Sequence, residues 1–279
     1  MGIGLSGSNP GSRSSAPAAT GGPTDRRRSV KLSLRGVGVS YKGRWAVRGV
    51  DLDVAAGGCT ALVGPSGAGK SSLLLAIDRL HDLDPEAAVV GRIQIGPDVV
   101  SDLDPQQLRR RVGLLFQRPA PFPLSIVENV AFPLRAHGVR GAAVGARVEE
   151  SLRAVALWDE VSDRLDARAL TLSGGQQQRL CLARALALEP EVLLLDEPCA
   201  ALDPAATARV EEALVRLRGR VTVLVVTHNL GQARRLADEV ACLWPGPDGG
   251  TVAELGPTQQ VLQQPSHPDV AAWLAGTLG

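Results

Sequence analysis

Gly64-Pro65-Ser66-Gly67-Ala68-Gly69-Lys70-Ser71 is the stretch that decides the fold. It fits the pattern G-x-x-x-x-G-K-S, in which a glycine-rich backbone wraps phosphate oxygens and leads into a helix. The apolar run Thr60–Val63 precedes the stretch, and apolar residues recur at helical spacing from Leu73 to Leu80. A chance glycine turn lacks this context. The order strand, loop, helix therefore predicts a phosphate-binding loop in an α/β protein.

The residue types in this loop predict how a nucleotide is held. Backbone N–H groups and the positive end of the following helix face the same anion. Lys70 would reach the β- and γ-phosphates of ATP, and the hydroxyl of Ser71 would ligate Mg²⁺. The predicted nucleotide-binding segment consists of Gly64, Pro65, Ser66, Gly67, Ala68, Gly69, Lys70, Ser71 and Ser72.

Two carboxylates end the apolar run Val192–Leu195. Ligands bind at the carboxyl ends of strands in open α/β sheets, so Asp196 and Glu197 are expected at the binding edge. Asp196 can hold Mg²⁺ through water, and Glu197 can polarise the attacking water as a general base. Two surface acids after a strand are the simpler explanation. The nearby glycine loop favours the catalytic interpretation.

Two other polar residues also follow predicted strands. His228 comes after Val221–Thr227, and its imidazole could hold the γ-phosphate and the water in line. Gln117 follows Val112–Phe116, and its amide could touch the metal or the water. A lone histidine after a strand is more often structural, and the Gln117 assignment is weak by itself.

Leu172–Arg179, with the sequence LSGGQQQR, is the second unusual stretch. Ser173 and Gln176 form the pattern of a capping box at a helix start. Gly174 and Gly175 are poor helix formers, so we interpret them as positions where the backbone approaches an anion closely. One γ-phosphate already has its cradle at Gly64–Ser71. A second cradle is useful if it serves another subunit.

Tyr41, the only tyrosine, has two open interpretations. It shares an alternating face with Val37 and Val39, which is consistent with core packing. It could instead provide an aromatic surface for adenine.

Composition excludes several functional classes. A net charge of +1 gives no general indication of nucleic-acid binding. Apolar runs such as Val221–Val226 are too short to span a bilayer, and no secretory leader precedes Val30, so we expect a cytoplasmic chain. The four cysteines form no CxxC pair, which argues against zinc and disulfides.

The chain divides into a tail and one domain. Residues 1–29 are rich in small residues, proline and arginine, and we expect them to be disordered. The domain, residues 30–279, begins with a β-rich flank at Lys31–Tyr41 and Trp45–Val54. A mostly helical insertion is expected from about Arg118 to Leu170, entered through a proline-rich turn at Pro119, Pro121 and Pro123 and followed by a helix at Gln178–Leu188. The short apolar runs predict a parallel sheet covered on both faces.

Together these residues resemble the ATP-binding cassette (ABC) transporter ATPases from about Lys31 to Gly279. The resemblance implies a P-loop α/β fold with a parallel core sheet, an N-terminal antiparallel β subdomain and a helical signature subdomain at about residues 118–185. It also assigns roles by position. Gly64–Ser71 is the Walker A loop, Gln117 the Q-loop glutamine, Leu172–Gln176 the signature, Asp196 and Glu197 part of Walker B, Asp203 part of the D-loop, His228 the switch histidine and Tyr41 the adenine-stacking aromatic.

A narrower resemblance points to the phosphate-import ATPases. It rests on FQRPAPFPLSIVENV at Phe116–Val130, LSGGQQQRLCLARAL at Leu172–Leu186 and DEPCAALD at Asp196–Asp203. Ala68 and Ala200 depart from that subfamily, which often has cysteine and serine there.

The resemblance implies partners and a place in the cell. It implies a homodimer in which ATP and Mg²⁺ lie between Gly64–Ser71 of one subunit and Ser173–Gly175 of the other. It also implies two integral membrane permease subunits, an extracytoplasmic solute-binding protein, and a position at the cytoplasmic face of the cell membrane. The surface near Gln117 and Arg118–Val130 would dock the permease. An importer of another solute, such as a polar amino acid, and a soluble ABC ATPase without transport remain alternatives.

Overall fold

Strand β3 (Cys59–Val63) leads into the glycine loop and lies inside a six-stranded sheet, in the computed structural model of Met1 and residues 30–277. The strand order is β10-β9-β3-β8-β7-β6, and all neighbours pair in parallel except β10 with β9. The other strands are β6 (Val112–Leu115), β7 (Val192–Asp196), β8 (Thr222–Val226), β9 (Glu239–Trp244) and β10 (Thr251–Pro257). The predicted parallel core sheet is confirmed. The tail expected at residues 1–29 lies, apart from Met1, outside the described residues.

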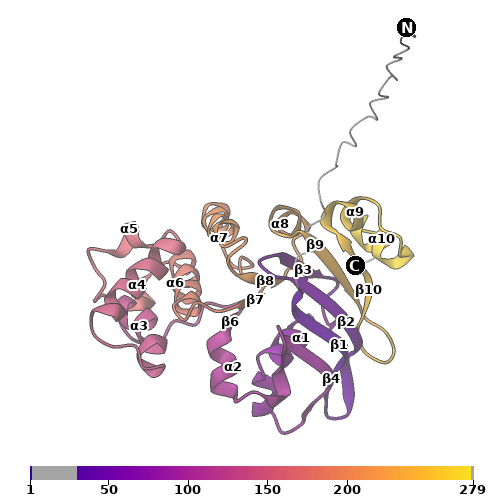
Figure 1. Ribbon diagram of the computed structural model, residues 1–279, viewed down its shortest axis with the longest axis horizontal. Helices are drawn as coiled ribbons and strands as arrows, with labels where there is room; N and C mark the ends of the chain where they lie inside the picture. The colour runs from indigo at the N-terminus through magenta and orange to yellow at the C-terminus, as the bar shows by residue number, and fades with distance from the viewer. Residues whose placement is uncertain (2–29, 278–279) are drawn as a thin grey trace.

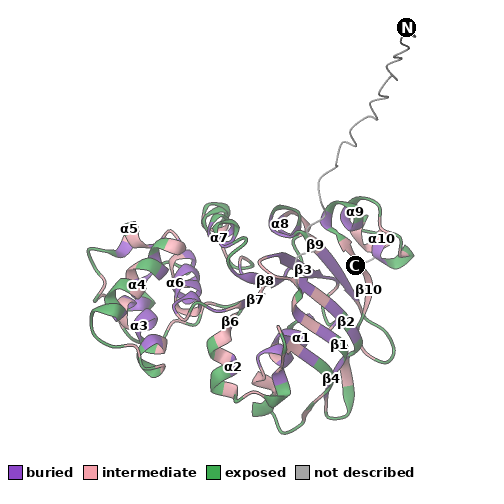
Figure 2. Cartoon of the chain, in the orientation of Figure 1, coloured by how far each residue is buried: buried purple, intermediate pink, exposed green. Residues whose placement is uncertain are grey.

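Alternating side chains of this sheet serve two separate apolar cores. Leu193 and Leu195 of β7 pack into one core, and Val192 and Leu194 pack into the other. Side chains of a strand point alternately to its two faces, so a strand that is buried on both faces must be apolar throughout. Figure 2 shows β7 and β8 in the colour of buried residues.

A four-stranded antiparallel sheet covers one side of the molecule, with strand order β2-β1-β4-β5 among residues 30–277. Its strands are β1 (Val30–Tyr41), β2 (Arg44–Ala55), β4 (Ala87–Ile95) and β5 (Asp98–Val99). Buried side chains of β1 and β2 share a core with helix α1 (Lys70–Ile77), which follows the glycine loop. The antiparallel β part expected at the N-terminal side is therefore present.

Four helices gather on the opposite side, at the left of Figure 1, and join the sheet through β6 and β7. They are α3 (Ile126–Ala136), α4 (Ala142–Ala154), α5 (Trp158–Val161) and α6 (Gly174–Leu186). The helices of the expected insertion begin at Ile126, after the proline-rich turn that was expected to lead into them. Residues 117–125 hold no helix, because prolines at 119, 121 and 123 lack the N–H that a helix needs. Ser125 caps α3 by accepting from the N–H of Glu128 at 3.2 Å.

The remaining helices lie along the sheet. They are α2 (Pro105–Arg111), α7 (Pro204–Arg216), α8 (Leu230–Leu236), α9 (Thr258–Gln263) and α10 (Pro268–Leu274), with short 3₁₀ turns at Leu80–Leu83, Val100–Asp102 and Ala169–Thr171. None of the helices in residues 30–277 has the length and apolar character that a membrane span needs.

Asp78 is an unusual buried acid at the C-terminal end of α1. It is 4% exposed, its Oδ1 accepts no hydrogen bond from a described residue, and its nearest cation is Arg109 at 3.9 Å. Burial raises the pKa of its carboxyl to about 7, and Arg109 opposes this shift. The charged form of Asp78 is therefore costly in the folded chain.

We predict that Asp78→Asn stabilises the protein at high pH. The pKa of Asp78 is higher in the folded chain than its ordinary 3.8, so its contribution to stability is full below about pH 4 and is lost as the pH rises to about 7. Asparagine has no charge to bury. The variant should melt several degrees above the parent at pH 8, with little difference at pH 4.5. Thermal unfolding of both proteins at the two pH values measures this. A difference that is the same at both pH values would contradict it.

Candidate functional site

The glycine loop between β3 and α1 is shaped by close backbone approaches. A Cβ on Gly64, where φ is 139°, would lie 2.0 Å from the carbonyl oxygen of Leu243. A Cβ on Gly69, where φ is 86°, would lie 2.5 Å from the carbonyl oxygen of Ala46. Only glycine fits either position, because both the conformation and the space exclude a side chain. Among the other expected contact positions, Ala68 is buried, Pro65 and Ser72 are half-buried, and Ser66 and Gly67 are exposed.

Lys70 is the buried cation of this loop. Its side chain donates from Nζ to the carbonyl oxygens of Gly64 at 2.9 Å and Pro65 at 2.8 Å. Burial lowers the pKa of Lys70, while the charges of Glu197 and Asp196 oppose that shift. The two carboxylates thus act on Lys70 across the end of the sheet. The structure brings the loop and the carboxyl end of β7 together.

Asp196 and Ser71 form an oxygen-rich pair at the same place. Burial raises the pKa of Asp196, and a hydrogen bond from Ser71 and the charge of Lys70 partly offset this. A hydroxyl and a carboxylate are the hard oxygen ligands that Mg²⁺ prefers. A buried carboxylate also gains from a cation nearby. These two residues therefore fit the predicted metal-binding role.

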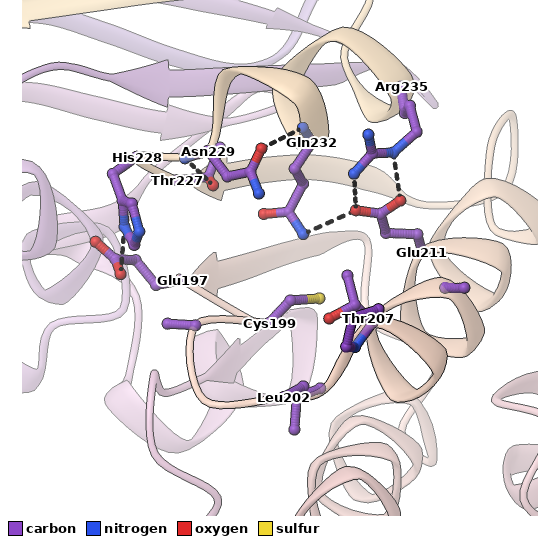
Figure 3. Close-up of a pocket in the computed structure, with 13 residues that line it drawn as sticks. Glu197, Cys199, Leu202, Thr207, Glu211, Thr227, His228, Asn229, Gln232 and Arg235 are labelled. Atoms are coloured by element: carbon purple, nitrogen blue, oxygen red, sulfur yellow. Dashed lines mark hydrogen bonds and ion pairs between the residues drawn. The ribbon is translucent and has the colours of Figure 1, made fainter.

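Glu197 receives two side chains that come from other strand ends. Its Oε2 accepts from Gln117 Nε2 at 3.2 Å and from His228 Nδ1 at 2.8 Å (Figure 3 shows the His228 contact). The Glu197 backbone has φ of 45° and donates its N–H to the carbonyl of Val226 at 2.9 Å. A non-glycine residue in this conformation is strained, and such strain often marks a functional site. The structure thus gathers the three predicted catalytic residues.

The hydrogen bond between Glu197 and His228 limits what each group can do. An ionised carboxylate can only accept, so His228 Nδ1 carries the proton in this contact. The side chain of His228 is 64% exposed, whereas that of Glu197 is 19% exposed. The exposed ring of His228 can therefore contact a group that enters from solvent. The carboxylate of Glu197 is held in place by its hydrogen bonds to Gln117 and His228. This arrangement suits a base that orients water beside a phosphate.

A cavity of about 600 Å³ is lined by Glu197 and His228 together with residues of α7 and α8 (Figure 3). In its wall, the buried carboxylate of Glu211 on α7 accepts from Arg235 at 2.6 and 2.8 Å and from Gln232 at 3.3 Å. Arg235 and Gln232 belong to α8, the helix that begins just after His228. These bonds fix α8 on α7, and with it the strand end that carries His228.

The start of α6 is the capping box that the sequence predicts. Ser173 Oγ accepts from the N–H of Gln176 at 3.3 Å, and Gln176 Oε1 accepts from the N–H of Ser173 at 3.1 Å. A Cβ on Gly174 would meet nothing within 4 Å, whereas a Cβ on Gly175 would lie 2.6 Å from Cβ of Ala206. Gly175 is therefore required by packing between α6 and α7. Packing therefore accounts for the glycine at 175 without a ligand. The approach of an anion to Gly174 and Gly175 stays a prediction.

The predicted signature lies apart from the glycine loop of the same chain. Figure 1 places α6 with the helices at the left, whereas α1 lies to their right, beside β1. Ser173 and Gly174 are exposed. One chain thus holds a phosphate loop and a second exposed helix start that do not face a common ligand.

Two further expected contact residues have identifiable local roles. Asp203 caps α7, and its Oδ1 accepts from the N–H groups of Ala205 and Ala206 at 2.9 Å each. Tyr41 ends β1 opposite Arg44 and is half-buried against the core of the antiparallel sheet. Both the packing and the adenine interpretations of Tyr41 remain compatible with that position.

Sequence reasoning did not single out Glu160 or Glu211. Each lies in a helix outside any recognisable motif, and each becomes notable only when the fold brings arginines to it. An acid in a helical pattern gives no signal of burial or of a distant partner.

The chain is similar over most of its length to proteins of known function. Residues 47–200 match the family described as ABC transporter. Phosphate import ATP-binding protein PstB 1 of Nitrosococcus oceani is 51% identical over 251 residues, which cover 89% of this chain and 91% of that protein. The PstB protein of Thermotoga maritima is 45% identical over 89% of this chain and 98% of that protein. A PstB 1 protein of a Synechococcus strain is 43% identical, with 94% and 99% covered.

A solved structure of a bacterial Atm1-family ABC exporter with ATP bound is similar in fold. It matches with a TM-score of 0.72 and 27% identity. The match covers 88% of this chain and 42% of the exporter chain, so this chain spans less than half of that protein.

We predict opposite effects for the two adjacent glycines of α6. Gly175→Ala forces a methyl group against Ala206 and should lower stability by roughly 1–3 kcal/mol. Gly174→Ala enters open space and should leave the melting temperature unchanged or slightly raised, because alanine favours a helix. Thermal unfolding of the two variants under one condition tests this. Equal effects of the two changes would contradict the packing role of Gly175.

Proposed function

The chain belongs to the ABC transporter family, within its group of phosphate import ATP-binding proteins, and from that premise we propose that it hydrolyses ATP to drive import of inorganic phosphate. The observation that carries the ATPase reaction is the meeting of Gln117 and His228 on the carboxylate of Glu197, beside the loop Gly64–Ser71. Phosphate as the solute is supported by what the relatives are named to import.

Binding of ATP follows from the loop. Backbone N–H groups of Gly64–Ser71 and the start of α1 surround the phosphates, and Lys70 turns its ammonium to the β- and γ-phosphates. Ser71 and Asp196, with Gln117, would hold Mg²⁺. The ion supplies positive charge that neutralises the phosphate oxygens. Tyr41 offers its ring to adenine.

Hydrolysis requires a water in line with the γ-phosphate. Glu197 accepts a hydrogen bond from that water and takes its proton as the new oxygen–phosphorus bond forms. The bond between the γ-phosphorus and the bridging oxygen breaks, and ADP and phosphate leave. His228 and Gln117 hold the Glu197 carboxylate in place, and exposed His228 can reach the γ-phosphate.

The active unit in this proposal is a homodimer. ATP on Gly64–Ser72 of one subunit meets Ser173–Gln176 and Asp203 of the other, twice about a two-fold axis. The proposal is supported by the exposure of Ser173 and Gly174 at the start of α6, a helix that lies apart from α1 in its own chain (Figure 1). Loss of the γ-phosphate removes the group that bridges the subunits.

An exposed apolar patch supports membrane partners. Phe116, Phe122, Leu124 and Phe132 are 46%, 36%, 39% and 52% exposed, and the rings of Phe122 and Phe132 lie 5.2 Å apart. Apolar patches of this kind mark interaction sites. We propose that this patch docks one of two integral membrane permease subunits at the cytoplasmic face of the membrane, in a system completed by an extracytoplasmic solute-binding protein. The helical subdomain, about residues 118–185, then carries the signature and all of the docking patch except Phe116.

We predict that Glu197→Gln separates binding from turnover. The amide cannot take the proton of water, so kcat should fall by roughly 100-fold or more while ATP still binds. The variant should elute as a dimer with ATP and as a monomer without it. Light scattering after size exclusion measures this. The double variant Glu197→Gln/Ser173→Arg is the control and should stay monomeric. A Glu197→Gln monomer at saturating ATP would contradict the dimer proposal.

The solute is tested by uptake of radiolabelled phosphate. Cells that lack this chain should lose high-affinity uptake and recover it with the native chain but not with Lys70→Ala. Uptake of a labelled polar amino acid serves as the control and should be unchanged. Normal phosphate uptake in cells without any duplicate of this chain would refute phosphate as the solute.

A further inference from the structure

Glu160 of α5 collects four hydrogen bonds from side chains in the described part of the chain. Its Oε1 accepts from Arg179 Nη1 at 2.9 Å and from Arg209 Nη1 at 3.1 Å. Its Oε2 accepts from Arg179 Nη2 at 2.9 Å and from Gln176 Nε2 at 2.9 Å. The donors lie on α6 and α7, so one carboxylate joins three helices.

The contact with Arg179 fixes the charge of Glu160. Arg179 is 1% exposed, and a buried guanidinium needs a carboxylate partner. The two-point hydrogen bond from Arg179 lowers the pKa of Glu160 against the opposing effect of burial, and Gln176 and Arg209 add to the lowering. Glu160 is therefore an ionised acceptor at neutral pH and can donate no hydrogen bond.

The contact with Gln176 fixes the capping box. An amide has one donor end and one acceptor end. Because Glu160 can only accept, it binds the NH₂ end of Gln176 and turns the oxygen toward the N–H of Ser173, where the distance is 3.1 Å. A reversed amide would place oxygen against carboxylate and NH₂ against N–H. Glu160 thus selects the one orientation of Gln176 that closes the cap on Ser173.

The contact with Arg209 joins α5 to α7, and through the same carboxylate it links α7 to α6. Arg209 lies three residues after Ala206, so the two share a face of α7. Ala206 is the residue that leaves room only for glycine at position 175. The ion pair holds α7 to α5 and the close approach holds α7 to α6, so both contacts seat α7 against the helices that carry the signature.

We propose that Glu160 is a positioning residue of the signature, which sets the orientation of Gln176 and holds the exposed Ser173 and Gly174 in the geometry that meets ATP on the partner subunit. This inference rests on the proposed role of the signature in the dimer. Glu160 itself touches no nucleotide. It acts through Gln176 and through the seating of α6 on α7.

The test compares steady-state ATPase kinetics of the full chain carrying Glu160→Gln with the native chain. The substitution keeps size but gives Gln176 no fixed partner, so we expect kcat to fall roughly tenfold. Affinity of the isolated subunit for a fluorescent ATP analogue should be unchanged, because Gly64–Ser72 lies elsewhere. Glu149→Gln is the matched control. It removes a carboxylate from the same helix group, one that pairs with Arg153, and should keep the native kcat.

A second variant separates positioning from simple loss of the Arg179 partner. The exchange Glu160→Gln/Gln176→Glu rebuilds the pair with donor and acceptor swapped, and serine with glutamate is also a capping box. It should recover most of the kcat lost in Glu160→Gln. Gln176→Glu alone sets two carboxylates together and should be slower than the exchange. This comparison applies even if Glu160→Gln does not fold.

Three results overturn the proposal. They are native kcat in folded Glu160→Gln, a fall that the exchange does not recover, and Gln176→Glu as fast as the exchange. Ser173→Arg, measured alongside, separates this failure from failure of the proposed function. If Ser173→Arg abolishes turnover while Glu160→Gln does not change it, only the role of Glu160 is lost. If Ser173→Arg keeps normal turnover, the signature itself has no role in the site.

Discussion

Parallel pairing of β3, β8, β7 and β6 is the constraint on which the site depends. It brings the carboxyl ends of four strands to one edge, so residues distant in sequence meet there. The glycine loop follows β3, and Glu197, His228 and Gln117 follow the other three. The apolar character of these strands keeps the register. A slip of one residue would turn Leu193 and Leu195 to the opposite core and carry Glu197 away from its partners.

The signature, the second proposed phosphate-binding segment, lies on the helical group α3–α6 and not on the sheet. α6 begins with an exposed helix start, and its support comes from contacts at its back: the close approach of Gly175 to Ala206 and the carboxylate of Glu160. Ser173 and Gly174, at the start of the helix, are exposed to solvent. A helix start that is fixed by buried contacts and exposed at its first residues is suited to meet a phosphate held by another subunit.

Local sequence predicted the strands β1, β2, β3, β6, β7 and β8, the glycine loop and the capping box, because each has its own period or spacing. The strands β5, β9 and β10 were not predicted. The strand β4 and the helices α7 and α8 were not predicted, since their sequences mix polar and apolar residues and gain stability from tertiary packing. Gly175 is a case within the site where the local motif did not reveal a tertiary contact. Its nearest neighbour, Ala206, lies on another helix, so a motif alone suggested an anion where packing already requires glycine. Glu160 and Glu211 gave no local signal at all.

In the proposed dimer, the signature of one subunit completes the site that holds ATP on the other. The most direct measurement is a structure of the full chain with a non-hydrolysable ATP analogue bound. We expect a two-fold dimer in which Ser173 Oγ of each subunit lies about 3 Å from a γ-phosphate oxygen of the ATP bound to the Gly64–Ser72 segment of its partner. An occupied Gly64–Ser72 segment with Ser173 of both subunits facing solvent would contradict it.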